Sequence, residues 1–261
     1  MLQPHSPEWY ERLSQLQEGY YYPWKSSLSP LNGEDEYLQM LRQLMSPEMV
    51  VLEVGCGHGQ IPIALAPLCR WIVAYDRTTA FIELARQAAA AQEIANISFI
   101  EAESIATLLD SPDFPANKQP FDLIISRRGP LNWVENVRMV ARPGTILFVL
   151  NPKESVLPFW NDRIPEPLRL ANPRTYSRQS SVERRLGLAG LKWHSAWSFD
   201  VPEYFAAPRD LYNRLSWGYT PDEVPSFEAV ASILDEIYAE YADEQGLAVP
   251  HGRFMWQAVV D

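Results

Sequence analysis

The chain has 261 residues, of which 47% are hydrophobic, and its formal net charge is −11. This length and apolar content suit one large α/β domain with a full core, and the acidic balance does not steer the whole protein toward nucleic acid. Two cysteines without metal-ligand spacing exclude a disulfide scaffold and a cysteine-based zinc site. We expect a cytoplasmic protein without a metal, a signal peptide or a membrane span.

The first predicted element is a short amphipathic helix over residues 7–18, followed by the aromatic-dense segment Gly19-Tyr20-Tyr21-Tyr22-Pro23-Trp24. This segment either packs an amino-terminal arm onto the main domain or closes over a bound cofactor and acceptor. Aromatic faces suit a cation and a planar acceptor alike, so the residue types allow both interpretations. We separate residues 1–46 as a helical arm or lid.

The central motif runs from residue 50 to residue 59 and reads Val-Val-Leu-Glu-Val-Gly-Cys-Gly-His-Gly. A run of apolar, mostly β-branched residues predicts a buried strand, and the alternate glycines predict a tight turn that lets a ligand approach the backbone. A helix is expected after it, with Pro62 near its start. Doubly wound α/β sheets hold an adenosyl cofactor at such a strand–turn–helix unit, although Gln60 stands where the dinucleotide fingerprint needs glycine.

This glycine pattern resembles motif I of class I S-adenosyl-L-methionine (SAM)-dependent methyltransferases, and the resemblance covers about residues 49–150 well. It implies an α/β, Rossmann-like fold with a seven-stranded, mostly parallel sheet and helices on both faces. It also implies SAM as the cofactor of a core over residues 47–151. In that interpretation SAM is lined by the residues of the motif, which are Glu53, Gly55, Cys56, Gly57, His58 and Gly59.

The next two predicted strands, over residues 71–76 and 97–101, each end in polar residues. The resemblance assigns Asp76, with Arg77 beside it, to the cofactor, because a carboxylate there can accept hydrogen bonds from both ribose hydroxyls. It assigns Glu103 and Ser104 to the edge of the adenine. The alternative at both places is a helix cap.

The fourth predicted strand, residues 121–126, ends in Ser126-Arg127-Arg128, where the family faces the transferred methyl group. We assign Ser126 to the cofactor site, and Arg127 and Arg128 to orientation of the acceptor, because arginine holds anions in a forked geometry. The alternative is that each arginine pairs with a nearby acidic side chain. No general base is assigned.

Residues 152–261 are expected to hold acceptor-binding helical insertions after strands five and six, with strands six and seven completing the sheet. The first insertion is locally basic, which suits either a solvated face or an anionic acceptor. The second is expected over residues 200–253. Pro130 and residues 217–221 and 254–256 also show a weak resemblance to bacterial methyltransferases that modify a guanine of large-subunit ribosomal RNA.

These features predict transfer of a methyl group from SAM to a small or medium-sized acceptor, with an anionic acceptor as one option. The alternatives are an RNA acceptor (ribosomal or transfer RNA) and a SAM-binding protein without transferase activity. An NAD-dependent oxidoreductase is disfavoured by Gln60. The acceptor atom and the oligomeric state do not follow from the sequence.

Overall fold

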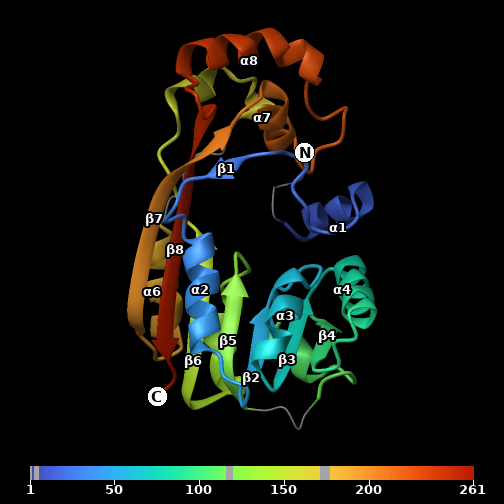
Figure 1. Cartoon of the computed structure of the whole chain (residues 1–261). Helices are drawn as coiled ribbons and strands as arrows, with labels where there is room; N and C mark the ends of the chain where they lie inside the picture. The colour runs from blue at the N-terminus through green and yellow to red at the C-terminus, as the bar shows by residue number, and fades with distance from the viewer. Residues whose placement is uncertain (1, 3–5, 116–119, 171–176) are drawn as a thin grey trace. The chain divides into compact units, whose positions relative to one another are not determined.

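The computed structural model describes every residue except 1, 3–5, 116–119 and 171–176 (Figure 1). The chain divides into two compact units that interleave along the sequence. Unit 1 comprises Met1–Asn32, Glu154–Thr175 and Phe199–Gly252, and unit 2 comprises Gly33–Lys153, Tyr176–Ser198 and Arg253–Asp261. The sequence instead predicts three consecutive segments, residues 1–46, 47–151 and 152–261, and this division stays a prediction.

The strands form one mixed sheet in the order β1-β7-β8-β6-β5-β2-β3-β4. They are β1 (Ser27–Leu28), β2 (Val50–Val54), β3 (Trp71–Asp76), β4 (Ile97–Glu101), β5 (Phe121–Arg127), β6 (Ala141–Pro152), β7 (Trp193–Phe205) and β8 (Leu247–Val259). Strands β6, β5, β2, β3 and β4 pair in parallel, and β8 runs antiparallel to β6. The predicted Rossmann-like α/β fold is therefore confirmed.

The expected count of seven strands is wrong by one. The additional strand, β1, has two residues and pairs antiparallel with β7, joining Ser27 to Tyr204 and Leu28 to Glu203. A two-residue strand carries no periodicity, so the sequence offers no signal for it. The second insertion is also shorter than expected, because β7 continues to Phe205 and β8 already begins at Leu247.

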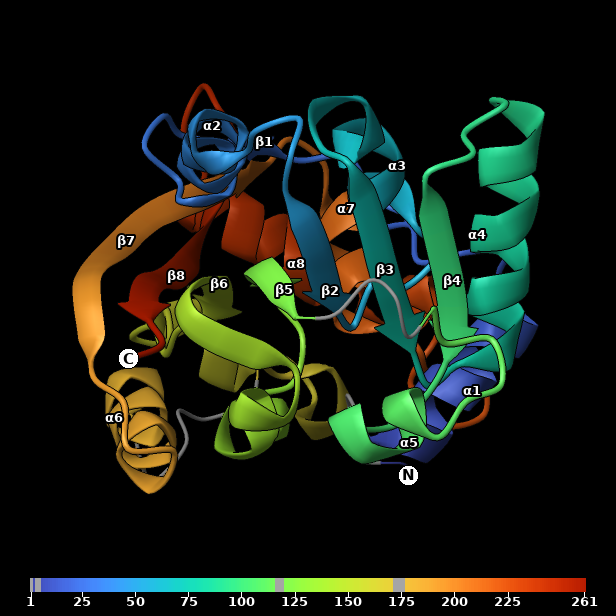
Figure 2. The ribbon, with the colours of Figure 1, turned by 90° about the horizontal axis from the view of Figure 1, so that it is seen from below.

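Helices cover both faces of the strands of unit 2 (Figure 2). One face carries α2 (Glu34–Leu44), α3 (Gln60–Leu65) and α4 (Thr79–Ala91), and the other carries α5 (Ile105–Leu109), η3 (Asn132–Met139) and α6 (Arg178–Leu188). The short turn η1 (Ala66–Leu68) follows α3. Because both faces are covered, all five residues of β2 are buried, which explains why this strand is a continuous apolar run apart from Glu53.

The core of unit 2 joins the sheet to its second layer of helices. Val54, Ile124, Val149 and Trp256 belong to one buried cluster together with residues of α5, η3 and α6. On the other face the ring of Tyr37 in α2 stacks on Phe148, with 5.0 Å between the ring centroids. This packing sets the first residue of α2 near the carboxyl ends of β5 and β6, where the candidate site lies.

Unit 1 has its own core and its own helices, α1 (Pro7–Leu16), η4 (Phe159–Arg163), η5 (Glu166–Leu168), α7 (Pro208–Leu215) and α8 (Phe227–Tyr241). Its buried cluster includes Trp160, Phe205, Leu211, Leu234 and Ile237. Helix α8 contributes its apolar stripe at the three- and four-residue spacing of an amphipathic helix. Among the described residues, every helix is too short or too polar to cross a bilayer.

Candidate active site

The turn after β2 has the backbone geometry that its glycines predict. Gly55, Gly57 and Gly59 have φ angles of +71°, +53° and +83°, in the left-handed region that side chains disfavour. At Gly59 a Cβ atom would also lie 2.7 Å from the Cβ of Ala85, so the position has no room for another residue. The turn therefore presents bare backbone at the carboxyl end of β2, and α3 begins directly after it.

Asp76, at the carboxyl end of β3, holds this turn in place. Its Oδ2 accepts a hydrogen bond of 2.9 Å from the backbone N–H of Gly57, and its Oδ1 accepts one of 3.0 Å from the N–H of Thr78. Each carboxylate oxygen has a second lone pair, so Asp76 can still accept hydroxyl donors. Its assigned ribose contact, and the assignment of the half-buried Arg77 beside it, stay predictions.

Glu53 is buried inside β2, and its Oε2 makes no hydrogen bond among the described residues. Burial raises the pKa of Glu53 to about 8, with Arg127 opposing the shift and Asp76 adding to it. The side chain is therefore neutral at pH 7. A neutral carboxyl with one unsatisfied oxygen at the base of the glycine turn is available to a ligand.

Burial keeps the other two side chains of the turn, Cys56 and His58, in their neutral forms. Burial raises the pKa of the Cys56 thiol, with the nearby Asp76 and Glu53 adding to the shift, so the sulfur stays protonated. Burial lowers the pKa of His58, so its imidazole is neutral at pH 7. Both residues lie in the turn as predicted, and their contact with SAM stays a prediction.

At the end of β4 the structure contains a helix cap, which was the alternative interpretation for Glu103 and Ser104. The Oγ of Ser104 accepts a hydrogen bond of 3.2 Å from the N–H of Thr107 and starts helix α5. The side chain of Glu103 is exposed beside it. Glu103 is therefore the more available of the two for an adenine, and that role stays a prediction.

Ser126 is fully buried at the end of β5 and ties this strand to β2. Its Oγ donates a hydrogen bond of 2.9 Å to the carbonyl of Val54. The backbone of Gly129 lies so close that a Cβ there would be 2.4 Å from this Oγ. Ser126 thus positions the strand end, and its direct contact with a cofactor stays a prediction.

Arg127 and Arg128 lie around the carboxylate of Glu34, the first residue of α2 (Glu34–Leu44). The Nε of Arg127 is 2.7 Å from Oε2 of Glu34, and the Nε of Arg128 is 3.8 Å from Oε1. A third arginine, Arg253 of β8, places its Nε 2.5 Å from the same Oε1. We call these four residues the arginine cluster; sequence reasoning missed Glu34 and Arg253, which are 219 positions apart.

The arginine cluster has more positive than negative charge. Burial would raise the pKa of Glu34, but Arg128, Arg253 and Arg127 outweigh it and lower that pKa to about 2, so the group is ionised. Within these four residues three guanidinium groups surround one carboxylate, and their side chains are at most 20% exposed. Arg128 also has a left-handed backbone with φ +62°, the kind of local strain that clusters at functional sites.

The basic stretch after β6 does not form an open anion-binding patch among the described residues. Arg163 pairs with Glu236 and Glu240 of α8, and Arg169 donates to the carbonyl of Ile164. Arg185 pairs with Glu135. These contacts favour the interpretation as structural surface charge.

The aromatic segment of the arm packs within unit 1. The ring of Trp217 makes edge contacts with Tyr20, Tyr22 and Trp24, with centroids 5.1 to 5.6 Å apart. It makes another with the buried Trp9 at 5.1 Å. These contacts favour the packing interpretation, and closure over a ligand stays a prediction.

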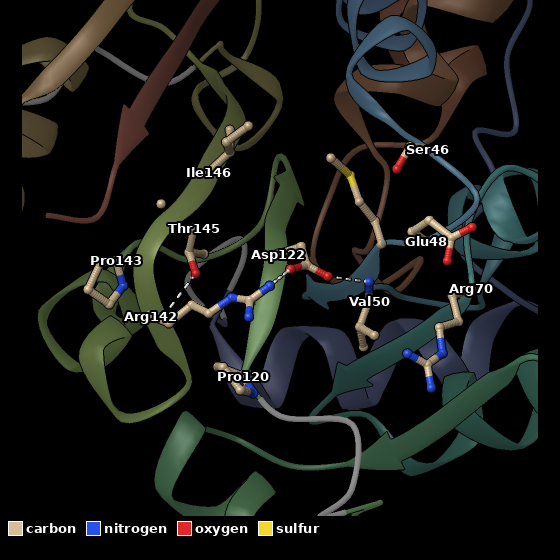
Figure 3. Close-up of a pocket in the computed structure, with 12 residues that line it drawn as sticks. Ser46, Glu48, Val50, Arg70, Pro120, Asp122, Arg142, Pro143, Thr145 and Ile146 are labelled. Atoms are coloured by element: carbon tan, nitrogen blue, oxygen red, sulfur yellow. Dashed lines mark hydrogen bonds and ion pairs between the residues drawn. The ribbon is translucent and has the colours of Figure 1, made fainter.

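A cavity of about 670 Å³ lies at the opposite, amino-terminal edge of the parallel strands (Figure 3). It opens between the starts of β2, β5 and β6, and the ion pair between Arg142 and Asp122 crosses it. Asp122 also accepts a hydrogen bond of 2.8 Å from the N–H of Val50. Since open α/β sheets bind ligands at the carboxyl edge, we place the cofactor at the glycine turn and not in this cavity.

Comparison with known proteins finds one similar domain family and several similar structures. A family model described as a methyltransferase domain matches residues 45–172. A functionally unknown protein from Deinococcus radiodurans has a similar structure, with 22% identity and a TM-score of 0.64 over 97% of this chain and 99% of that one. A SAM-dependent methyltransferase from Geobacter sulfurreducens, solved with S-adenosyl-L-homocysteine, aligns at 17% identity and a TM-score of 0.52 over 98% and 99% of the two chains. A second, from Thiobacillus denitrificans with the same ligand, aligns at 15% identity and a TM-score of 0.53 over the same fractions.

Proposed function

We propose that this chain, as a class I SAM-dependent methyltransferase, methylates a small or medium-sized acceptor that carries a negative charge. The family model supports the methyltransferase activity. The arginine cluster supports the charge of the acceptor. The described residues contain no group of three or more histidine, cysteine, aspartate or glutamate side chains that could hold a metal ion.

The residues at the carboxyl ends of β2 and β3 fit SAM. The turn at Gly59 has no room for a side chain, Asp76 has free lone pairs, and Glu53 has an unsatisfied buried oxygen. When bound, SAM supplies a methyl group on a sulfonium sulfur, which is already electrophilic. The contribution of the protein is therefore mainly to place the acceptor in line with that methyl group and to exclude water.

The single observation that carries the acceptor class is that three arginines converge on one carboxylate in the arginine cluster. Three arginine side chains that surround one carboxylate favour a bound anion, because arginine is the side chain best suited to recognise anionic groups. Arginine binds carboxylate or phosphate through two parallel hydrogen bonds, which would also orient the acceptor. We assign Arg127, Arg128 and Arg253 to this task, with Glu34 holding their side chains in place.

An RNA acceptor is the second candidate, and it has less support. The net charge is −11, and the arginines of the basic stretch make the structural contacts described above. RNA binding would show a steep dependence on salt concentration. SAM binding without any methyl transfer would instead indicate a SAM-binding protein that lacks the activity.

The proposal is tested by incubating the protein with methyl-labelled SAM and cell extract, and then separating RNA from small molecules by size and charge. We expect the label in a low-mass, anionic fraction. Asp76→Ala should weaken SAM binding by roughly 1–3 kcal/mol, through loss of hydrogen bonds to the ribose and of the bond that holds Gly57. An unchanged SAM affinity would show that the ribose lies elsewhere.

The substitutions Arg127→Gln and Arg253→Gln distinguish acceptor binding from cofactor binding. Each should reduce transfer to the labelled fraction about tenfold or more, as loss of a charged hydrogen bond implies, while SAM affinity changes less than twofold. Arg70→Gln is the matched control, because Arg70 is an exposed arginine at the other edge of the sheet. A loss of SAM affinity in the two cluster variants would mean that the cluster holds the cofactor's own carboxylate.

A further inference from the structure

Asn151 is fully buried near the carboxyl end of β6, within unit 2. Its side-chain Oδ1 accepts a hydrogen bond of 3.1 Å from the indole N–H of Trp256. An indole nitrogen can only donate, so the amide atom that faces Trp256 must be the oxygen, and the other must be Nδ2. Nδ2 carries two N–H donors and makes no hydrogen bond among the described residues.

The strand register indicates where these donors point. In the pairing of β6 with β8, Asn151 lies opposite Phe254. Trp256 lies opposite Val149, which is two residues deeper in the sheet. The indole therefore approaches Asn151 from the interior and turns Oδ1 back toward it. Nδ2 leaves the same carbon atom on the other side, so its donors point toward the carboxyl edge of the sheet.

An unpaired buried N–H destabilises the folded protein, because it has lost its hydrogen bond to water and gains none in return. Asn96 shows the ordinary arrangement, since its Nδ2 donates to the carbonyls of Ala66 and Cys69 over 2.8 and 3.1 Å. Oε2 of Glu53, which is also buried without a hydrogen bond among the described residues, lies at the same carboxyl edge as Asn151. This is the edge at which open α/β sheets bind their ligands.

Strand β6 lies between the two strands that carry the arginine cluster. The backbone N–H of Arg128 on β5 donates a hydrogen bond of 2.7 Å to β6, and Arg253 on β8 pairs with the last residue of β6. The glycine turn is two strands away, which is about 10 Å. Asp76, which we assign to the ribose, lies on β3, on the side of β2 away from β6. Asn151 is therefore placed for the acceptor and not for the cofactor.

Asn151 and the arginine cluster lie on opposite faces of the sheet. Side chains alternate between the two faces along a strand. Phe148 packs on α2, so Val149 and Asn151 point to the other face, whereas the arginines gather around the first residue of α2. A ligand that contacts both must therefore cross the end of β6. It needs an anionic group on one side and a hydrogen-bond acceptor on the other.

We infer that Nδ2 of Asn151 donates a hydrogen bond to an unprotonated oxygen of the methyl acceptor, at a point separate from the arginine cluster. This inference rests on the proposed function. An amide N–H pairs with a carbonyl or carboxylate oxygen, whereas an ammonium group has no lone pair to offer it. The acceptor is therefore an anion that carries a second, carbonyl-type oxygen. Asn151 selects for that oxygen, because a ligand without it leaves the donors unpaired.

The test measures transfer by the full-length protein from methyl-labelled SAM to the anionic extract fraction that wild type labels. Asn151→Asp keeps an oxygen for the indole of Trp256 and replaces the donor group with a second oxygen. We expect the amount of the fraction needed for half-maximal transfer to rise about tenfold or more, as the loss of one hydrogen bond implies. SAM affinity should stay within twofold of wild type.

The matched control is Asn96→Asp, which removes donors that already bond to backbone carbonyls. It should lower the free energy of unfolding, measured by urea denaturation, and leave the amount needed for half-maximal transfer unchanged. If Asn151 had only a structural role, Asn151→Asp would behave in the same way as this control, which would overturn the inference.

The outcomes separate a failure of the inference from a failure of the proposed function. Folded Asn151→Asp that needs no more than twice the wild-type amount of the fraction would overturn the inference and leave the proposed function standing, because Nδ2 then meets only a buried water. A tenfold loss of SAM affinity would also overturn it, since the donor would belong to the cofactor. Wild type that binds SAM but labels no anionic small molecule would refute the proposed function, and this inference with it.

A second measurement applies even where Asn151→Asp does not fold. The component that wild type methylates is purified from the fraction and added to ¹⁵N-labelled wild type. The side-chain amide signals of Asn151 should shift in the NMR spectrum, while those of Asn96 stay in place. Unchanged Asn151 signals at a saturating concentration of this component would overturn the inference.

Discussion

Two buried glutamates, one in each unit, have similar acidity and opposite surroundings. Glu34 in unit 2 faces three arginines, whereas Glu203 in unit 1 faces one arginine, one serine hydroxyl and one histidine. Neighbouring groups lower the pKa of both to about 2. The first cluster has three arginines for one carboxylate, and the second has one arginine for one carboxylate.

This difference shows that the number of charges around a buried carboxylate determines what the cluster can bind. Three arginines around one carboxylate favour an anionic ligand, while a single arginine beside one carboxylate forms an ion pair without formal net charge. A pKa alone would not distinguish the two clusters, because it is the same for both. The count of partners and their chemistry does.

Among the substitutions that test this comparison, Glu34→Gln should have the largest effect on the free energy of unfolding. Removing this charge leaves three guanidinium groups without their shared partner, so the free energy of unfolding should fall by about 3–5 kcal/mol. Urea denaturation measures the loss, and added phosphate should restore part of it by occupying the arginine cluster.

The control for this substitution is Glu36→Gln in the same helix. Glu36 accepts a hydrogen bond of 2.6 Å from the backbone N–H of Gly33, and the side-chain oxygen of glutamine can also accept it. Its loss should stay within about 1 kcal/mol. Equal losses in the two variants would contradict the special position of Glu34.

The second prediction concerns the stability of the protein at low pH. The folded-state pKa of Glu34, about 2, lies below its ordinary value of 4.5, so its charge stabilises the protein fully above pH 4.5 and loses that effect as the pH falls toward 2. The stability difference between wild type and Glu34→Gln should therefore shrink steadily on acidification from about pH 5 to about pH 2.5. Denaturation curves at several pH values measure this, and a difference independent of pH would refute the assigned ionisation.

The third prediction concerns Glu53, a third buried glutamate, whose Oε2 lacks a hydrogen-bond partner among the described residues. Its folded-state pKa of about 8 lies above 4.5, so the unfolded chain ionises first and wild type loses stability as the pH rises between these values. Glu53→Gln cannot ionise, so its stability relative to wild type should rise with pH between about 5 and 8, by up to about 1.4 kcal/mol per pH unit. Denaturation curves in which this relative stability falls with pH would mean that Glu53 is ionised and paired.

The sequence by itself determined the central unit of this protein. The apolar run of β2, the spaced glycines and the acidic end of β3 are signals that lie within about 25 residues of one another, and local backbone preference explains each of them. The parallel order of the core strands followed from the resemblance to methyltransferases that those residues carry. The arginines at the end of β5 were also visible in the sequence, although their partner was not.

Only the tertiary structure brought together the two clusters. Glu34 meets Arg127 across 93 positions and Arg253 across 219, and Ser26 meets Glu203 across 177. Such pairs depend on which strands become neighbours and on how a helix crosses the sheet, and no periodicity in the chain records either choice. Burial then decides the ionisation of each group, because desolvation and neighbouring charge act only once the chain has folded around it.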